Sequence, residues 1–201
     1  MKSDIPVTSL QRLPVYLNYL KTLNSDGYIS SGAIARALDM GEVLVRKDLA
    51  YTSAQGRTRV GYSLKELISA IEDYLGCNDV KEAVIVGAGE LGNALLSYGG
   101  FVNYGIELAA AFDNDPVKIG KEIAGKPVYD FAEAENVIKK RRIKLAVLCV
   151  PASVAQAAAD KLIGCGVERI LNFAPVLIKA ADSVTVRNID VAANLAILSS
   201  M

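Results

Sequence analysis

The most informative part of the sequence is Ala83-Val84-Ile85-Val86-Gly87-Ala88-Gly89-Glu90-Leu91-Gly92. Its first four residues predict a buried strand, and a GxGxxG pattern follows the strand and opens a helix. The first glycine of this pattern permits a tight turn, the second lets the backbone approach a pyrophosphate, and the third lets helix and strand pack closely. The helix N-terminus then stabilises the phosphate charge. Residues 87–92 are therefore the candidate binding loop for a dinucleotide.

One acidic residue supports this interpretation. Asp113 ends the next expected strand, Leu108 to Asp113, and lies 21 residues after Gly92. An acid at this distance accepts hydrogen bonds from the ribose hydroxyls, and its charge repels the 2′-phosphate of NADP, so the pattern favours NAD(H). The alternative is a Rossmann-like domain whose glycines merely make a tight turn. Asp115-Pro116 is instead typical of a helix cap, and we do not expect Asp115 to be a ligand.

Strands and helices alternate along the second part of the chain. Strands are expected at residues 83–86, 108–113, 128–129, 145–150, 169–171 and 184–186, and a final helix from about Asp190. This alternation predicts an α/β fold with a parallel, doubly wound sheet of the Rossmann type.

The pattern changes near residues 76–79, and before them most apolar residues recur at helical spacing. One helix contains the stripe from Leu13 to Leu23, a second follows a cap at Ser30 or Ser31, a third runs from about Glu42 to Tyr51, and a fourth starts at Ser63. Residues 55–62 are too polar and glycine-rich for a helix and suit two short strands with a turn.

This arrangement is typical of a winged helix-turn-helix domain. Arg46 and Lys47 lie on the helix after the turn, which such domains place in the major groove of DNA. Arg57 and Arg59 lie in the expected hairpin, which could act as a wing that reaches phosphates or the minor groove. The alternative is a solvated face on a small helical interaction domain, and the pattern alone does not decide between them.

Charge and composition fit two modules. The chain has 22 basic and 22 acidic residues and a net charge of 0, but residues 1–62 carry +3 and the remainder −3. Hydrophobic residues make up 52% of the 201 residues, enough for sizeable cores. Histidine is absent, which excludes His-based triads, His-ligated metals and imidazole acid–base chemistry.

No constellation supports catalysis, so no catalytic residue is expected. A Rossmann dehydrogenase needs a proton relay beside the nicotinamide, and the chain has neither histidine nor a Tyr-x-x-x-Lys pair. Cys77, Cys149 and Cys165 are widely spaced, so we expect neither a zinc site nor a disulfide framework. No stretch approaches the roughly 20 apolar residues of a membrane span, and the first residues do not resemble a signal peptide. We expect a cytoplasmic protein.

Taken together, the motifs resemble the Rex family of redox-sensing transcriptional repressors from about Ile5 to Leu198. The stretches that carry the resemblance in the first half are Arg12-Leu13-Pro14-x-Tyr16, Ile29-Ser30-Ser31, Val45-Arg46-Lys47-Asp48-Leu49 and Gly61-Tyr62. Those in the second half are Val86-Gly87-x-Gly89-x-Leu91-Gly92, Phe112-Asp113-x-Asp115-Pro116-x-Lys118-Ile119-Gly120, Val150-Pro151-Ala152 and Ile170-Leu171-Asn172-Phe173-Ala174-Pro175. One departure falls in the wing, where the family usually has Arg-Gly before Val-Gly-Tyr and this chain has Thr58-Arg59-Val60.

The resemblance implies a homodimer that binds a palindromic operator, with NADH releasing it from DNA and NAD⁺ competing to permit repression. It implies a winged-helix domain over residues 1–77, a Rossmann domain over 78–189 and a helix exchanged between subunits over 190–201. It also implies that Tyr98, Val150, Pro151 and Phe173 join residues 87–92 and Asp113 at the nucleotide. Finally, Arg12, Tyr98 and Asp190 match positions that the family uses as a redox-linked contact.

Two other hypotheses remain at this point. The first is an NAD-dependent oxidoreductase with a helical N-terminal appendage. The second is a DNA-binding paralogue whose Rossmann domain senses something else or serves only for dimerisation.

Overall fold

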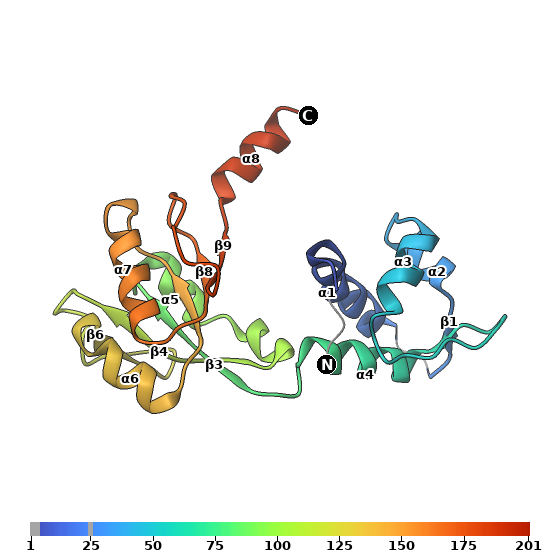
Figure 1. The fold of residues 1–201 in the computed structure, drawn as a ribbon, viewed down its shortest axis with the longest axis horizontal. Coiled ribbons are helices and arrows are strands. Elements are labelled where there is room, and N and C mark those ends of the chain that lie inside the picture. Colours follow the sequence, from blue (N-terminus) through green and yellow to red (C-terminus); the bar gives the residue numbers. More distant parts are fainter. Residues whose placement is uncertain (1–4, 24–25) are drawn as a thin grey trace. The chain divides into compact units, whose positions relative to one another are not determined.

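The computed structural model describes residues 5–23 and 26–201, and the chain divides into two units, Met1–Asp79 and Val80–Met201 (Figure 1). Residues 1–4 and 24–25, which belong to the expected winged-helix domain, lie outside the described residues.

Four helices and a two-stranded sheet form the N-terminal unit. The helices are α1 (Val7–Thr22), α2 (Ser31–Ala37), α3 (Glu42–Leu49) and α4 (Leu64–Leu75), and β1 (Tyr28–Ile29) pairs antiparallel with β2 (Tyr62–Ser63). The apolar stripe predicted on the first helix is the inner face of α1, and it packs against apolar residues of the other three helices. The residues of this core that are almost fully buried are Leu13, Tyr16, Leu17 and Leu20 of α1, Ile34 of α2, Leu49 of α3, and Leu67 and Ile71 of α4. Side-chain caps start α2 and α4, because Ser30 accepts from the Ala33 N–H and Ser63 from the Glu66 N–H.

The hairpin expected within residues 55–62 is shorter than predicted. Arg57 and Gly61 exchange two backbone hydrogen bonds of 2.8 and 2.9 Å as an isolated bridge, and the chain then leaves the hairpin to form β2. Gly61 makes this possible, because its φ is +97° and a Cβ there would overlap the carbonyl oxygen of Ile29. The residues after Gly61 therefore pair with β1, which is distant in sequence, and do not extend the hairpin.

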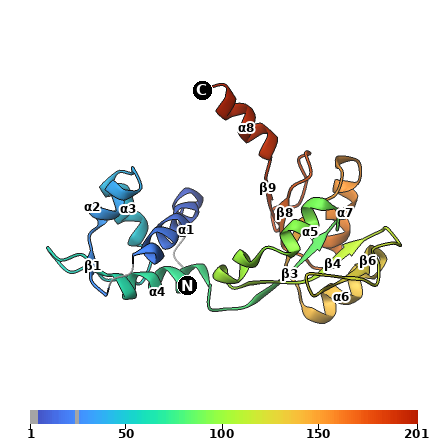
Figure 2. The ribbon, with the colours of Figure 1, turned by 180° about the vertical axis from the view of Figure 1, so that it is seen from behind.

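A seven-stranded sheet forms the C-terminal unit, in the order β5-β6-β4-β3-β7-β8-β9. Figure 2 shows this unit from behind. The strands are β3 (Lys81–Val86), β4 (Ile106–Asp113), β5 (Glu122–Ile123), β6 (Lys126–Asp130), β7 (Leu145–Leu148), β8 (Arg169–Asn172) and β9 (Thr185–Asn188). All neighbouring strands are parallel except β5 and β6, which confirms the predicted doubly wound sheet. The sequence did not predict β5, a short antiparallel strand that a two-residue turn with positive φ at Ala124 and Gly125 joins to β6.

Helices cover the two faces of this sheet unequally. On one face, α6 (Ala134–Arg141) and α7 (Ala152–Gly164) pack on residues such as Val84, Phe112 and Leu148. On the other face, α5 (Glu90–Leu96) covers Ile85 and its neighbours, followed by a short 3-10 helix, η1 (Gly99–Tyr104). A second 3-10 turn, η2 (Phe131–Glu133), precedes α6, and α8 (Val191–Ser199) follows β9.

Two local predictions are wrong. The strand expected over residues 145–150 ends at Leu148. The Cys149 N–H still bonds the Val86 carbonyl, but the chain then turns at Pro151 into α7. Asp115-Pro116 does not cap a helix. Its carboxylate accepts from the Val117 N–H in a turn over residues 116–120, and the Gly120 N–H then bonds the Val128 carbonyl.

Among the described residues, no helix combines the length and apolar character needed to cross a membrane.

Candidate dinucleotide site and nucleic-acid interface

Residues predicted beside a dinucleotide follow four neighbouring strands of the C-terminal unit. Asp113 ends β4, Gly87 follows β3, Val150 lies just after β7, and Phe173 follows β8. Ligands of open α/β sheets bind in the crevice outside the carboxyl ends of the strands, where the helices change faces. The topology therefore gathers these residues, distant in sequence, at one edge of the sheet.

The glycine loop has the shape that a pyrophosphate requires. Gly87 has a φ of +97°, and a Cβ there would overlap the carbonyl oxygen of Cys149. A Cβ on Gly92 would overlap the carbonyl oxygen of Gly87, so only glycine lets α5 pack this closely on β3. In contrast, a Cβ on Gly89 would meet no atom within 4 Å, so its backbone faces open space. The loop thus leaves exposed backbone at its second glycine, which fits a dinucleotide phosphate.

Asp113 is tied to this loop. Its side chain is 8% exposed, and one carboxylate oxygen accepts from the Ala88 N–H at 2.8 Å. The other oxygen accepts from the N–H groups of Asn114 and Asp115, each at 2.9 Å, and Lys118 Nζ lies 3.0 Å from the first oxygen. Burial alone would raise the pKa of Asp113, but these hydrogen bonds outweigh it and hold the pKa below its ordinary value. The residue is therefore ionised at neutral pH, as an acceptor for ribose hydroxyls must be.

The remaining predicted nucleotide residues line the rim of this edge or lie next to it. Glu90 and Leu91 are exposed at the start of α5, Pro151 is exposed, and Val150 and Phe173 are half-buried. Tyr98 lies beyond the end of α5, where its side chain is 61% exposed and contacts Phe101 edge-on at 5.2 Å. Its ring also covers Gly100, where a Cβ would overlap it. The residues present therefore fit a dinucleotide, with open space beside Gly89 in the glycine loop.

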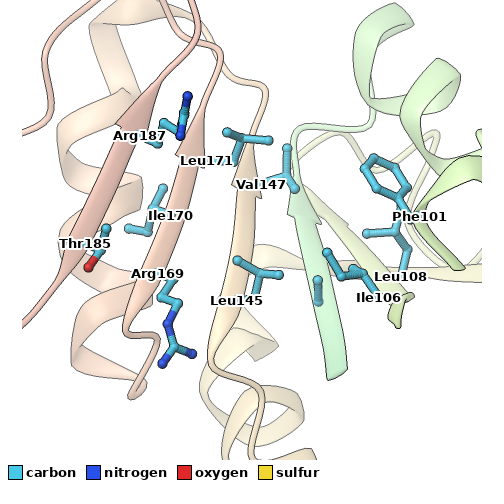
Figure 3. Close-up of a pocket in the computed structure, with 11 residues that line it drawn as sticks. Phe101, Ile106, Leu108, Leu145, Val147, Arg169, Ile170, Leu171, Thr185 and Arg187 are labelled. Atoms are coloured by element: carbon cyan, nitrogen blue, oxygen red, sulfur yellow. The ribbon is translucent and has the colours of Figure 1, made fainter. Parts of the chain in front are cut away.

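A separate apolar pocket of about 230 Å³ lies on the face of the sheet that α6 and α7 leave open (Figure 3). Leu145 and Val147 point into it from β7, Leu171 from β8 and Phe101 from η1 (Figure 3). Most of its lining comes from the amino-terminal halves of the strands, away from the glycine loop. The pocket is therefore distinct from the candidate dinucleotide site.

In the N-terminal unit, α3 has two different faces. Val45, Asp48 and Leu49 are buried, whereas Arg46 and Lys47 are exposed. Val43 and Leu44 are also exposed, at 55% and 40%, so the outer face combines two cations with apolar side chains. Such a face can meet phosphates and base edges in a major groove.

The two hairpin arginines have different surroundings. Arg57 stacks its guanidinium 5.2 Å from the centre of the Tyr28 ring, a cation–π contact that holds the base of the hairpin to β1. Arg59 is exposed at the tip with a φ of 63°, in the left-handed region that glycine usually occupies. Arg57 thus stabilises the hairpin, and Arg59 presents its charge outward.

Arg12 has a partner that the sequence analysis did not identify. Its guanidinium donates to both carboxylate oxygens of Asp48 at 2.6 and 2.8 Å, and the Tyr16 hydroxyl donates to Asp48 at 2.6 Å. Burial would raise the pKa of Asp48, but the bonds from Arg12, Tyr16 and Ser9 lower it, and burial with the Asp48 contact raises the pKa of Tyr16 to about 12. The ion pair therefore fixes α1 to α3 within this unit. Whether Arg12 also contacts Tyr98 and Asp190 stays a prediction, because those two residues lie in the other unit.

Asp48 and Lys118 are thus the residues that sequence reasoning missed. A signal existed for Asp48, because it shares the inner face of α3 with Val45 and Leu49, and an acid on an apolar face requires a buried partner. Lys118 gave no such signal, since its contact with Asp113 depends on the turn over residues 116–120.

A winged helix-turn-helix unit and a dinucleotide-binding Rossmann unit in one chain define a nucleotide-responsive DNA-binding regulator. The chain is 41% identical to the redox-sensing transcriptional repressor Rex of Treponema denticola over 100% of this chain and 97% of the relative. It is 40% identical to the same repressor of Desulforamulus reducens over 97% of this chain and 94% of the relative. The chain belongs to the Rex family of redox-sensing transcriptional repressors.

Family models and solved structures agree with this assignment. A model described as "Putative DNA-binding protein N-terminus" matches residues 4–50, and one described as "CoA binding domain" matches residues 78–176. The Rex-family repressor RSP, solved with β-NAD⁺ and operator DNA, has a TM-score of 0.93 and 31% identity over 98% of this chain and 92% of that one. RSP with β-NADH has a TM-score of 0.87 and 30% identity over 98% and 94% of the two chains. The relatives are named as repressors, so the chain is a regulator and not an enzyme.

Proposed function

We propose that the chain is a homodimeric repressor that binds a palindromic operator, senses the ratio of NADH to NAD⁺, and leaves DNA when NADH binds. The observation that carries this proposal is the presence in one chain of a glycine loop tied to an ionised Asp113 and of a helix, α3, that exposes Arg46 and Lys47. Solved relatives of the same family hold β-NAD⁺ with operator DNA in one case and β-NADH in another. A repressor that senses NADH acts where DNA and the NADH pool share a compartment, so we place it in the cytoplasm.

At the nucleotide site the chain binds and orients, and the dinucleotide supplies the redox state that is sensed. The open backbone at Gly89 leaves room for the pyrophosphate. Asp113 accepts hydrogen bonds from the ribose hydroxyls and, through the Ala88 N–H, also holds the glycine loop in place. Residues 87–92 surround the phosphates in this proposal, and Tyr98, Val150, Pro151 and Phe173 line the nicotinamide end.

On the DNA side, Arg46 and Lys47 enter the major groove and Arg59 extends from the wing tip, with Arg57 nearer its base. Arg46→Ala should weaken operator binding by about 30-fold for each half-site, the middle of the range for one groove contact. Arg59→Gly keeps the turn, because glycine favours its positive φ. It should make the logarithmic salt dependence less steep by about 1 for each subunit, or about 2 for the dimer. An unchanged salt dependence for Arg59→Gly would remove Arg59 from the interface.

Coupling between the units is proposed to run through Arg12, Tyr98 and Asp190. Asp190 also caps α8, because its carboxylate accepts from the Ala193 N–H at 2.8 Å. Asp190→Asn separates the two roles, since asparagine is an equally good cap but carries no charge. This variant should bind NADH and operator yet lose the release of DNA by NADH. If NADH still releases Asp190→Asn as it does the wild type, Asp190 is not part of the contact.

The dimer in this proposal uses α8. None of its residues is buried, and apolar side chains lie all around it, with Val191, Leu195, Ile197 and Leu198 each about 60% exposed or more. An apolar helix of this kind requires a partner surface, and a palindromic operator requires a two-fold protein. Leu195→Asp should shift the mass in solution from a dimer toward the 21.4 kDa monomer. A wild-type protein that is monomeric at micromolar concentration would contradict the proposal that α8 is exchanged between two subunits.

The decisive experiment is an operator titration at fixed salt with NADH and NAD⁺ varied separately and coenzyme A as the control nucleotide. We expect NADH to release the DNA, NAD⁺ to oppose NADH, and coenzyme A to do neither. Linkage requires that operator DNA weaken NADH binding by the same factor. Failure of NADH to alter operator affinity would instead favour a paralogue that senses something else, and NADH turnover with a carbonyl substrate would favour an oxidoreductase.

A further inference from the structure

The carboxylate of Asp113 has no free acceptor position. An ionised carboxylate offers about four such positions. Here the N–H groups of Asn114 and Asp115 take two on one oxygen, and the Ala88 N–H and Lys118 Nζ take two on the other. A ribose hydroxyl can therefore reach Asp113 only in place of one of these four donors.

Lys118 is the donor that can move. The three backbone donors are fixed, because Ala88 belongs to the glycine loop and residues 114 and 115 continue directly from β4. Lys118 lies in the turn over residues 116–120, its side chain is 34% exposed, and its ammonium also lies 3.8 Å from Asp115. A flexible lysine can leave the carboxylate without any change in the backbone, since its four-carbon stem rotates freely.

We propose that Lys118 is a specificity-determining residue of the nucleotide site, acting as a pair with Asp113 to select a ribose 2′-hydroxyl over a 2′-phosphate. This inference rests on the proposed function. The one ammonium cannot neutralise both the buried carboxylate and a 2′-phosphate, so a 2′-phosphorylated dinucleotide leaves one anion unpaired. A 2′-hydroxyl brings no charge, and it can donate to the position that Lys118 vacates.

Selection by the Asp113–Lys118 pair has a consequence that repulsion by the Asp113 charge alone does not have. If Asp113 merely repelled the 2′-phosphate, its neutralisation would end the repulsion and create no site. In the proposed arrangement, neutralising Asp113 removes the nearer of the two carboxylates beside the Lys118 ammonium, which then binds the 2′-phosphate as a charge-assisted partner. A protein with a neutral residue at position 113 should therefore bind NADPH, and this binding should require Lys118.

Three variants test this, D113N, D113N/K118A and K118A, each titrated with NADH and with NADPH by calorimetry. The quantity compared is the Kd for NADPH divided by the Kd for NADH. We expect D113N to lower this ratio by at least about tenfold. The double variant should lose most of that gain, and K118A alone should raise the ratio, because Asp113 is then without its counter-ion. NADPH should also release D113N, but not the wild type, from operator DNA.

An unchanged ratio in D113N, or equal ratios in D113N and D113N/K118A, would overturn the proposal. If D113N does not fold, K118A decides alone, because its lysine is partly exposed and a ratio that stays the same or falls is incompatible with the pair. Operator binding without nucleotide checks that each variant is folded. A wild-type protein that binds no NADH would overturn the proposed function, whereas wild-type NADH binding with unchanged ratios would overturn only the role of Lys118.

Discussion

Among residues 5–23 and 26–201, each unit buries one carboxylate, and the two are held by different kinds of donor. Asp48 in the N-terminal unit is 1% exposed and is bound by the side chains of Arg12 and Tyr16, which come from another helix. Asp113 in the C-terminal unit is 8% exposed and is bound by three backbone N–H groups and one lysine. In both cases these bonds keep the carboxylate ionised despite its burial.

The difference separates a structural carboxylate from one that can serve a ligand. Side-chain donors from α1 make Asp48 a link between two helices, with Tyr16 fully buried and the Arg12 side chain 22% exposed. Backbone donors fix Asp113 at the end of β4 and leave only Lys118 to be exchanged. Asp113 therefore keeps one partner that a ligand can replace, whereas the partners of Asp48 join two packed helices.

Removal of Arg12, the main partner of Asp48, should have the largest effect on the stability of the protein. Arg12→Ala leaves the Asp48 charge buried with only hydroxyl donors, and we expect a loss of about 3 kcal/mol in the free energy of unfolding. Urea denaturation of the purified protein measures it. Arg46→Ala, which removes an exposed arginine of α3, is the control and should change stability by less than about 0.5 kcal/mol. Equal effects for the two variants would mean that the Arg12–Asp48 pair does not hold the unit together.

Removal of the acid in the C-terminal unit should instead affect the ligand. Asp113→Ala deletes a charge-assisted acceptor and the tie to Ala88, so NADH binding should weaken by about 30-fold, equivalent to about 2 kcal/mol. Asp115→Ala is the matched control, because Asp115 is a neighbouring acid in the same turn, and its effect should be several-fold smaller. Calorimetric titration with NADH distinguishes the two. If Asp113→Ala weakens operator binding as strongly as NADH binding, the assignment of nucleotide binding and DNA binding to different units is wrong.

The two carboxylates also differ in their response to alkali. Both have a lowered pKa, so their stabilising contribution is present above about pH 4 and is lost as the pH falls through the folded-state pKa. Only Asp48 has a tyrosine partner, and the pKa of Tyr16 is raised to about 12. The contribution of Tyr16 is therefore present below about pH 10 and is lost as the pH rises toward 12.

Tyr16→Phe tests this alkaline limb. The free energies of unfolding of wild type and variant, measured between pH 7 and pH 11.5, should converge as the pH rises, because the unfolded wild type alone releases the Tyr16 proton above about pH 10. The titration of lysines is common to both proteins and cancels in the comparison. A constant difference across this range would show that the hydroxyl does not bind Asp48 as a neutral donor.

The smallest effect on stability should come from Lys118→Ala. Three backbone donors remain on Asp113 and the lysine is partly exposed, so we expect a loss of less than about 1 kcal/mol, as for a surface ion pair. Thermal unfolding beside Arg12→Ala gives the comparison directly. If Lys118→Ala destabilises the protein as much as Arg12→Ala, both carboxylates are structural, and the distinction between the units is wrong.

Sequence patterns were sufficient for most of the elements, β5 excepted, and for the edge of the sheet that carries the candidate site. Period and glycine spacing act locally, so the strand before Gly87, the loop to Gly92 and the acid at the end of β4 could be predicted before the fold was known. The wing was harder, because β2 pairs with β1 more than thirty residues away, and such pairing leaves no local signal. The same holds for the turn at Asp115-Pro116, which the hydrogen bond of Gly120 to β6 directs away from a helix.

Residue type and spacing are enough to predict a parallel sheet with a dinucleotide loop and a basic helical module before it. Which charged groups meet could be seen only in the folded protein. The fold pairs Arg12 with Asp48 across two helices and Lys118 with Asp113 across a turn. Contacts of this kind depend on the positions of whole elements in space, which hydrophobic packing sets and which no short motif records.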